Sequence, residues 1–353
     1  MRLACLRIVV VCVALAATVP CKAEDKPQEF KGWLSQPAQV EPKLLAWAAK
    51  YPDLVTLETE KTQGGHTAYA ITVTNRKIDD AKKRKLLVGQ PHAHEPASTA
   101  GMMDFLSELL DGTHADGRTT DLDRRPILDG YVLSFIPLGN PDGRARAPVA
   151  CWDGTKYTND EFLKFAFGRT PTGERCVRVG RWSIKDQQPA FIGIVYEQIN
   201  DHEYVEPNRD TGSSFFKLVH KLLAQRKYDL FLDIHQTEFE KSQRNVMILL
   251  PFLQKQLPEP IRKANEEAGK AVIAAWQQIG ANPIPEPQAL SYGEDQIRYF
   301  RKCWGEYYQT MPYICVEIQN NNQRTPAEMQ MRLAETSIRT SLGVIGQWST
   351  RRE

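Results

Sequence analysis

The chain has 353 residues, of which 42% are hydrophobic and 25% charged, and its formal net charge is +2. These values are typical of a globular protein, and the near-neutral charge leaves no basic field of the kind that nucleic acid binding requires. The length allows two domains, but single α/β domains of this size are common, and we expect one.

Residues 1–23 have the pattern of a secretory signal peptide. Arg2 and Arg7 give a positive start, Ile8–Ala17 is apolar, and Cys21–Ala23 is a small-x-small cleavage site. The apolar stretch is too short for a permanent membrane span. Removal of residues 1–23 would take away three basic residues and no acidic one, so the net charge would change from +2 to −1. We therefore expect an exported protein, periplasmic or extracellular, with no stable membrane span.

Four cysteines follow the signal segment: Cys151, Cys176, Cys303 and Cys315. An exported protein meets oxidising conditions, so a Cys151–Cys176 disulfide is one interpretation. Four unpaired thiols in buried positions are the other. The sequence leaves both open.

The first half of the chain alternates helical and strand patterns. Residues 24–36 are polar and are expected to be a flexible lead to a domain spanning residues 37–353. The expected elements are a helix over Pro42–Lys50, hairpin strands Leu54–Glu60 and Ala68–Thr74, a strand Leu86–Val88, a helix Thr99–Leu110 and a strand Tyr131–Ile136.

Residues 147–207 show little periodicity and contain Gly, Pro, Arg and two cysteines. A region of this kind is expected to be an irregular, functional loop insertion rather than a second domain.

Regular patterns return after the insertion. The expected elements are a helix Gly212–Gln225, strands Asp229–Ile234 and Val246–Leu250, a helix Pro258–Gly280, a strand Tyr313–Ile318 and a helix Pro326–Trp348. Strands that alternate with helices predict an α/β fold: a doubly wound, mixed and mostly parallel sheet with helices on both faces. Functional sites in such folds gather at the strand ends.

His92 and Glu95 follow the strand Leu86–Val88 at a Gly-Gln-Pro turn, with the spacing H-x-x-E. An imidazole and a carboxylate placed so can bind one zinc ion, which in a catalytic site needs a third protein ligand and an open position for water. His94 offers a second interpretation, because His92-x-His94 at a strand end is also how amidohydrolase barrels begin.

Further candidates end or follow later strands. His235 closes the strand DLFLDIH and is a natural third zinc ligand. Glu317 interrupts the apolar strand YICVEI, where a carboxylate is costly unless it has a partner or a task. Asn208 and Arg209 can hold a carboxylate, since Arg binds carboxylates bidentately.

The order of these motifs resembles the zinc metallocarboxypeptidases, the family of the pancreatic carboxypeptidases and their bacterial relatives. It comprises H-x-x-E, then N-P-D-G at 140–143, N-R-D at 208–210, the strand-end His235 and the strand Glu317. The family's inhibitory pro-segment has no room between Ala23 and Pro42, so we expect none.

The resemblance implies that His92, Glu95 and His235 bind one Zn2+. It implies that Glu317 deprotonates the zinc-bound water and passes the proton to the leaving amine. Asn208 and Arg209 would clamp the terminal carboxylate of a peptide, so that cleavage removes the C-terminal residue.

Two family roles have competing candidates in this sequence. Arg144, Arg146 and Arg169 compete for the arginine that polarises the scissile carbonyl, and we favour Arg146. Tyr292 and Tyr299 compete for the tyrosine that caps the substrate, and we favour Tyr299. The spacing to Glu317 would also place Lys302 in the side-chain pocket, which hints at acidic C-terminal residues.

The expected partner is a peptide or cell-wall peptide with a free C-terminal carboxylate, bound by a monomer. Two rival functions remain: a zinc amidohydrolase that uses His92 and His94, and a relative that binds a peptide or glycan without cleaving it.

Overall fold

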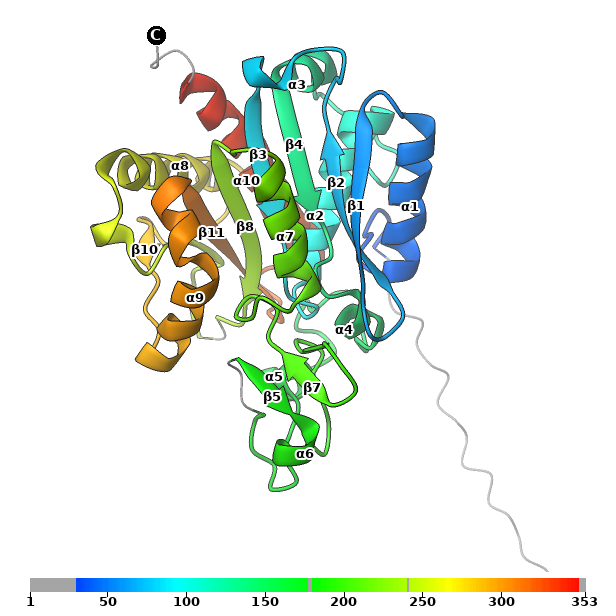
Figure 1. Ribbon diagram of the computed structural model, residues 1–353, viewed down its shortest axis with the longest axis vertical. Coiled ribbons are helices and arrows are strands. Elements are labelled where there is room, and N and C mark those ends of the chain that lie inside the picture. The colour runs from blue at the N-terminus through cyan, green and yellow to red at the C-terminus, as the bar shows by residue number, and fades with distance from the viewer. Residues whose placement is uncertain (1–29, 177–179, 240, 349–353) are drawn as a thin grey trace, which may run out of the picture.

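A mixed eight-stranded sheet runs through the molecule in the order β1-β2-β4-β3-β8-β11-β9-β10 (Figure 1). The computed structural model describes residues 30–176, 180–239 and 241–348. The strands are β1 (Val55–Lys61), β2 (Thr67–Val73), β3 (Arg84–Gly89), β4 (Tyr131–Ile136), β8 (Leu230–Thr237), β9 (Val246–Leu250), β10 (Gln288–Ala289) and β11 (Tyr313–Gln319).

The central strands β4, β3, β8 and β11 are parallel, whereas the hairpin β1–β2 and the β11–β9 pair are antiparallel. The predicted fold class, a mixed and mostly parallel sheet with helices around it, is therefore confirmed. The predicted bounds of β4 and β9 agree with the structure, and the hairpin agrees to within one residue.

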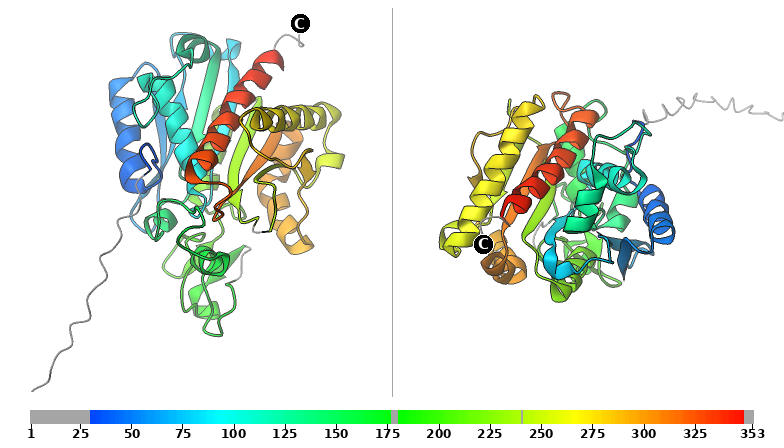
Figure 2. Two further views of the ribbon diagram at one scale, coloured as in Figure 1. Left: turned by 180° about the vertical axis from the view of Figure 1, so that it is seen from behind. Right: turned by 90° about the horizontal axis from the view of Figure 1, so that it is seen from above.

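Helices cover both faces of the sheet (Figure 2). The longer ones are α1 (Pro37–Lys50), α2 (Pro96–Asp111), α7 (Ser214–Gln225), α8 (Glu259–Gln278), α9 (Glu294–Thr310) and α10 (Ala327–Trp348), with the short α3 (Arg124–Gly130) and α4 (Pro141–Ala145) between strands. Side chains alternate across each strand, so one apolar cluster packs the sheet against α2, α8 and α10 and another packs it against α7 and α9.

Residues on β8 and β11 follow this alternation. Leu232 and Ile234 face the first cluster, so Asp233 and His235 lie on the other face of the sheet, together with Phe231 of the second cluster. The two polar side chains are therefore on the face that α7 and α9 cover.

The helix α2 places Glu95 at the edge of the sheet. Glu95 is its N-cap, Pro96 occupies the first turn, and Gly112 ends the helix with φ 78°, donating its N–H to the carbonyls of Glu108 and Ser107. From Pro96 to Leu110 every residue is buried, so the helix and its N-cap are fixed by packing.

The beginning of the described chain differs from the expectation of a flexible lead. Helix α1 starts at Pro37 rather than Pro42, and residues 30–36 pack against the domain. Trp33 and Ser35 are buried, and the Trp33 Nε1–H donates to the Ala150 carbonyl at 2.9 Å. The buried indole and its hydrogen bond hold this segment. The expected signal segment, residues 1–23, lies outside the described residues.

Residues 147–207 are more regular than their sequence indicates. They form the helices α5 (Asn159–Phe167) and α6 (Ile184–Gln187) and a small sheet in the order β5-β7-β6, from Arg181–Ser183, Glu203–Val205 and Glu197–Gln198. Their apolar cluster includes Trp152, Phe162 and Tyr196. These elements form the lower end of the molecule in Figure 1.

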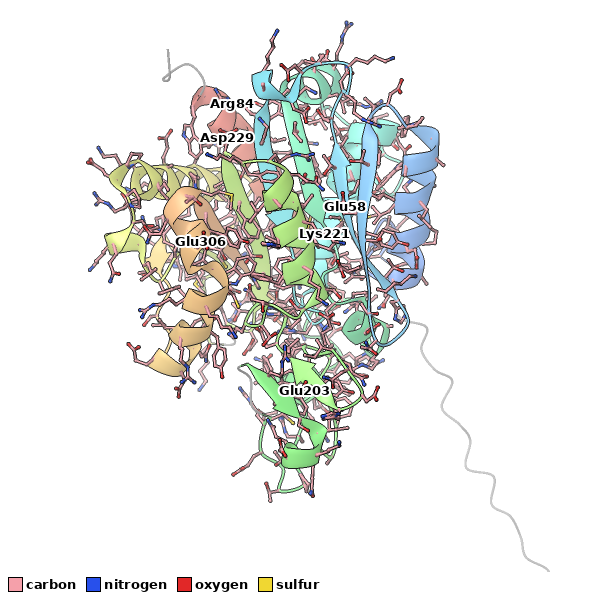
Figure 3. The ribbon with its side chains drawn as sticks, in the orientation of Figure 1. Glu58, Arg84, Glu203, Lys221, Asp229 and Glu306 are labelled. Carbon is pink, nitrogen blue, oxygen red and sulfur yellow. The ribbon has the colours of Figure 1, made fainter. Side chains whose placement is uncertain are left out.

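The insertion lies at the edge where the parallel strands end. Figure 3 places Glu203 of β7 at the opposite end of the molecule from Arg84 and Asp229, which form an ion pair where β3 and β8 begin. The carboxyl ends of β3, β8 and β11 therefore face the insertion.

The four cysteines in the described part of the chain are unpaired, and the Cys151–Cys176 disulfide is not formed. The two residues belong to different apolar clusters: Cys176 packs with the insertion, and Cys151 packs near Trp33. Across the described residues, no helix combines the length and apolar character that a membrane span requires.

Candidate active site

A cavity of about 350 Å3 opens at the carboxyl ends of β3, β8 and β11. Its lining includes six of the eight site residues that the sequence indicated. The polar and ionisable residues that line it are His92, His94, Glu95, Asn208, Arg209, His235, Gln236, Thr237, Glu238 and Glu317. Segments 92–95, 208–209, 235–238 and 317 are thus neighbours in space, although they are far apart in the chain.

His92, Glu95 and His235 converge at one point of this cavity. The two histidine Nδ1 atoms are 3.1 Å apart, and Glu95 reaches both: Oε1 lies 2.8 Å from His92 Nδ1 and Oε2 lies 3.0 Å from His235 Nδ1. Zinc bonds of about 2.0–2.2 Å in a tetrahedron separate ligand atoms by about 3.3 Å. The three side chains fit a zinc ion with a fourth position left over.

A buried carboxylate lies behind each of the two histidines. His235 Nε2 is 3.0 Å from Asp233 Oδ2, and His92 Nε2 contacts Glu206 Oε1. A carboxylate on the outer nitrogen fixes the ring orientation and raises the basicity of the nitrogen that faces the metal.

The electrostatics of the three residues favour a positive charge at their centre. Burial opposes charge on His92 and His235, but Glu95 and Glu206 raise the pKa of His92, and Asp233 and Glu95 raise that of His235 well above its ordinary value. Burial alone would raise the pKa of Glu95, yet the neighbouring histidines, His92 first, hold it well below the ordinary value. A divalent cation supplies the charge that this field favours.

His94 lies beside this group. Together with His92 and Glu95 it offers ligand atoms within 4.8 Å of one another, and its Nε2 lies 3.4 Å from Glu95 Oε1. Its ring packs edge-on against Phe167 of the insertion, with ring centroids 5.4 Å apart. His235 is closer to both His92 and Glu95 than 3.4 Å, so the set with His235 is the tighter of the two.

Glu317 lies beside His235 in the sheet. The two residues are register partners in the parallel pair β8–β11, and Glu317 is paired with Met247 on its other side. Its exposed fraction is 9%, and it lines the cavity. The interruption of the apolar strand thus places a carboxylate next to His235.

Asn208 and Arg209 reach the same cavity from the turn that precedes α7. The Trp304 Nε1–H donates to the Asn208 carbonyl at 2.8 Å, and Arg209 Nη1 lies 2.5 Å from Glu206 Oε1. The guanidinium carbon of Arg209 lies 4.8 Å from the centre of the Phe300 ring. These contacts hold the planar guanidinium at the cavity wall.

The structure does not bring Arg146 into the cavity. Its guanidinium donates to the carbonyls of Ile192, Gly193 and Tyr196 at 3.0–3.4 Å, so its donors serve the backbone of the insertion.

The two competing arginines are also engaged elsewhere. Arg144 donates to carbonyls of Ala93, Val149 and Ala150, and Arg169 donates to those of Gly168 and Leu163. Of the arginines that the structure describes, only Arg209 lines the cavity.

Tyr292, not Tyr299, lines the cavity. Tyr299 lies on α9, where Phe300 takes the inward position and Tyr299 packs beside Gly180 of the insertion. Tyr292 precedes the helix and stacks on Phe300, with ring centroids 5.7 Å apart. The sequence did not predict α9, whose helical rotation separates the directions of Tyr299 and Phe300.

Lys302 is exposed and is not part of the lining. Most of the rest of the lining is apolar or aromatic and includes Met247, Leu249, Leu250, Leu290, Phe300, Tyr313 and Cys315, with Ser291 as a further polar residue.

A second group with metal-ligating atoms lies between α2 and α10, formed by Asp104, Glu108, His114 and Glu335. Arg339 pairs with Glu108 and, at 2.6 Å, with Glu335, and His114 pairs with Asp104 at 2.9 Å. These ion pairs already compensate the carboxylates, so the group joins the two helices.

Sequence reasoning missed Glu206 and Asp233. Asp233 carries a usable signal, because it is a carboxylate in an apolar strand two positions before His235 and thus on the same face. Glu206 lies in an irregular segment without periodicity, and its proximity to Arg209 was the single hint.

The comparisons with known proteins agree with this geometry. The family model described as zinc carboxypeptidase matches residues 41–238, which is more than half of the chain and includes His92, Glu95, Asn208, Arg209 and His235. No curated protein matches the chain.

Several solved structures share the fold. A metallo-carboxypeptidase from Burkholderia cenocepacia has 16% identity and a TM-score of 0.54, with 87% of this chain and 69% of that chain covered. Carboxypeptidase A from Helicoverpa armigera has 13% identity and a TM-score of 0.54, with coverages of 89% and 73%. A metallo-carboxypeptidase from Pseudomonas aeruginosa, in complex with (2-guanidinoethylmercapto)succinic acid, has 14% identity and a TM-score of 0.52, with coverages of 87% and 68%.

The fold, the convergence of the motif residues in one cavity and the family match over residues 41–238 confirm the resemblance that the motif order indicated. The chain belongs to the zinc carboxypeptidase family of metal-dependent peptide hydrolases.

Proposed function

We propose that this protein is a zinc-dependent exopeptidase that hydrolyses the C-terminal amide bond of peptides. One observation carries the proposal: a group suited to zinc, a strand glutamate and a buried arginine line the same cavity of about 350 Å3. A free carboxylate held by Arg209 would leave the last amide bond of a peptide near the other two groups.

His92, Glu95 and His235 would hold the zinc ion, which supplies a more acidic water and polarisation of the carbonyl when bound. Asp233 and Glu206 keep the two imidazoles oriented, since each contacts the outer nitrogen of one ring. We assign no role in catalysis to Arg146.

Glu317 would act as the general base and then as the general acid. Its carboxylate takes a proton from the attacking water as the new C–O bond forms, and it gives that proton to the amine as the C–N bond breaks. Its place beside His235 in the sheet supports this role.

Asn208 and Arg209 would bind the terminal carboxylate, with Tyr292 rather than Tyr299 covering the bound residue. We further propose that the enzyme acts as a monomer outside the cytoplasm, on peptides or cell-wall peptides. The signal-peptide pattern of residues 1–23 supports the export.

Removal of zinc tests the proposal directly. We expect the purified protein to release single C-terminal residues from free-acid peptides, to lose this activity with a chelator, and to regain it with one equivalent of Zn2+ per chain. Mass spectrometry of the shortened peptides measures the release. Zinc binding without release would favour the rival, a relative that binds peptides but does not cleave them, and full activity after chelation would exclude a metallopeptidase.

The apolar lining predicts the preferred C-terminal residue. Leu249, Leu290 and Cys315 offer no charged partner, and a charged side chain would lose its hydration there. We expect kcat/KM to be about 100-fold higher for C-terminal Leu or Phe than for Asp or Glu. A peptide library that varies only the last residue measures this preference.

A variant of the cavity wall sharpens this test. Cys315 lies two positions before Glu317 on the same face of β11, so Cys315→Phe should fill the space for the side chain. We expect loss of activity on C-terminal Phe and retained activity on C-terminal Ala. Equal loss on both substrates would place Cys315 outside the side-chain pocket.

A further inference from the structure

One carboxylate joins the two functions of the cavity. Glu206 Oε1 contacts His92 Nε2, the outer nitrogen of a proposed metal ligand, and lies 2.5 Å from Nη1 of Arg209, the proposed clamp. All three side chains are at least 98% buried: Glu206 is 0% exposed, and His92 and Arg209 are each 2% exposed. The contacts therefore form in surroundings where water screens charge little.

His92 and Arg209 both contact the same oxygen of Glu206, Oε1. A hydrogen bond from the His92 Nε2–H to a carboxylate raises the basicity of the Nδ1 atom that faces the metal. The guanidinium of Arg209 competes for the negative charge of that oxygen, which weakens its effect on His92. The strength with which His92 binds a metal therefore depends on what else Arg209 contacts.

We propose that Glu206 couples the binding of a C-terminal carboxylate at Arg209 to the binding of zinc at His92; this inference rests on the proposed function. When a peptide carboxylate pairs with Arg209, the attraction between the guanidinium and the Glu206 carboxylate weakens. The hydrogen bond between Glu206 and His92 then strengthens. Zinc is then held more tightly when a substrate or product is present. By linkage, bound zinc strengthens carboxylate binding by the same factor.

Asp233 offers a matched control. It contacts the outer nitrogen of the other metal-ligand histidine, His235, at 3.0 Å, and its second partner is the Tyr313 hydroxyl at 2.9 Å rather than an arginine. Loss of either carboxylate should weaken zinc binding, by about 10–100-fold. Loss of Glu206 alone should also remove the coupling.

The experiment measures zinc affinity by competition with a chromophoric chelator, with and without saturating 3-phenylpropionate. This probe carries a carboxylate and an apolar group but no second metal donor, and neutral 3-phenylpropanamide is its control. In the wild type we expect about fivefold tighter zinc binding with the acid and no change with the amide.

Variants of Glu206 and Asp233 test whether Glu206 carries the coupling. We expect the coupling to fall to less than about twofold in Glu206→Gln and to remain near fivefold in Asp233→Asn, although both variants bind zinc more weakly. Glu206→Asp is a second variant that keeps the charge, and its shorter side chain should also lose the coupling because it cannot reach both partners. Thermal melting of the apoproteins verifies that each variant is folded.

Coupling that persists in both Glu206 variants would overturn the inference. If the coupling is lost equally in Asp233→Asn, it depends on zinc affinity in general and not on Glu206. That result would overturn the inference as well. Either result leaves the proposed function intact if the wild type binds zinc and releases C-terminal residues. A wild type that binds no zinc would defeat the proposed function itself.

Discussion

Replacing Glu317 by glutamine is expected to lower kcat by about 1,000-fold while the protein keeps its zinc. Glutamine preserves the shape of the side chain but cannot accept a proton from water, and positioned acid–base groups contribute about 10²–10⁴-fold. Zinc content should stay at one per chain, because the proposed ligands are His92, Glu95 and His235, which contact one another, and not Glu317. Single-turnover release of the C-terminal residue and metal analysis measure the two quantities.

A matched control for this variant is Glu335→Gln. Glu335 is another largely buried glutamate, but it lies between α2 and α10 and pairs with Arg339 at 2.6 Å, away from the cavity. Burial, and then the nearby Glu108, raise the pKa of Glu335 to about 7. We expect kcat within about twofold of wild type. A Glu317→Gln protein with normal turnover would refute the assignment of the general base.

The sequence predicted the parts of the site that are carried by regular strands. His235 and Glu317 lie in or at the end of short apolar runs, which indicated buried strands. The structure adds that the two residues are register partners in the parallel pair β8–β11. His92 and Glu95 follow β3 and precede α2, which begins at Pro96, three residues before the predicted start at Thr99. The apolar runs therefore placed these residues at strand ends, and the family resemblance selected His92, Glu95 and His235 as the proposed metal ligands.

Two of the favoured candidates, Arg146 and Tyr299, do not line the cavity. Arg146 and Tyr299 were chosen by their distance in the chain from other motifs, and such distance does not say where a side chain points. Arg146 donates to the carbonyls of the insertion, a contact between residues about 50 positions apart that no local pattern encodes. Tyr299 lies one helical position from Phe300, and this rotation of about 100° separates the cavity from the insertion.

The insertion shows the same limit in another form. Its small sheet pairs Arg181–Ser183 with Glu203–Val205, strands of three residues that are too short for a detectable alternation. Its contribution to the site, Phe167 at the cavity wall and Glu206 behind His92, depends on how it folds back on the main sheet. Composition indicated a functional insertion but could not assign these residues.

Replacing Arg209 by alanine is expected to abolish the preference for a free C-terminal carboxylate. In the wild type a free-acid peptide should be cleaved with a kcat/KM about 100–1,000-fold above that of its C-terminal amide, because a buried guanidinium–carboxylate pair contributes about 3–4 kcal/mol. In Arg209→Ala the free acid should fall to the level of the amide. Arg209→Lys, which keeps the charge but not the planar fork, should fall between them.

Arg146→Ala separates this clamp from the arginine that the sequence favoured for catalysis. Arg146 binds backbone carbonyls of the insertion and does not line the cavity, so its loss should leave the ratio between free acid and amide unchanged. The ratio is the useful quantity, because general damage to the fold lowers both rates together, whereas loss of the clamp lowers only that of the acid. A wild type that cleaves the acid and the amide equally well would show that Arg209 does not select a free carboxylate, and it would contradict the assignment of the clamp. Since the Arg209 guanidinium already lies 2.5 Å from Glu206 and 4.8 Å from the centre of the Phe300 ring, it is held in place before a peptide arrives, and little ordering is left for the substrate to impose.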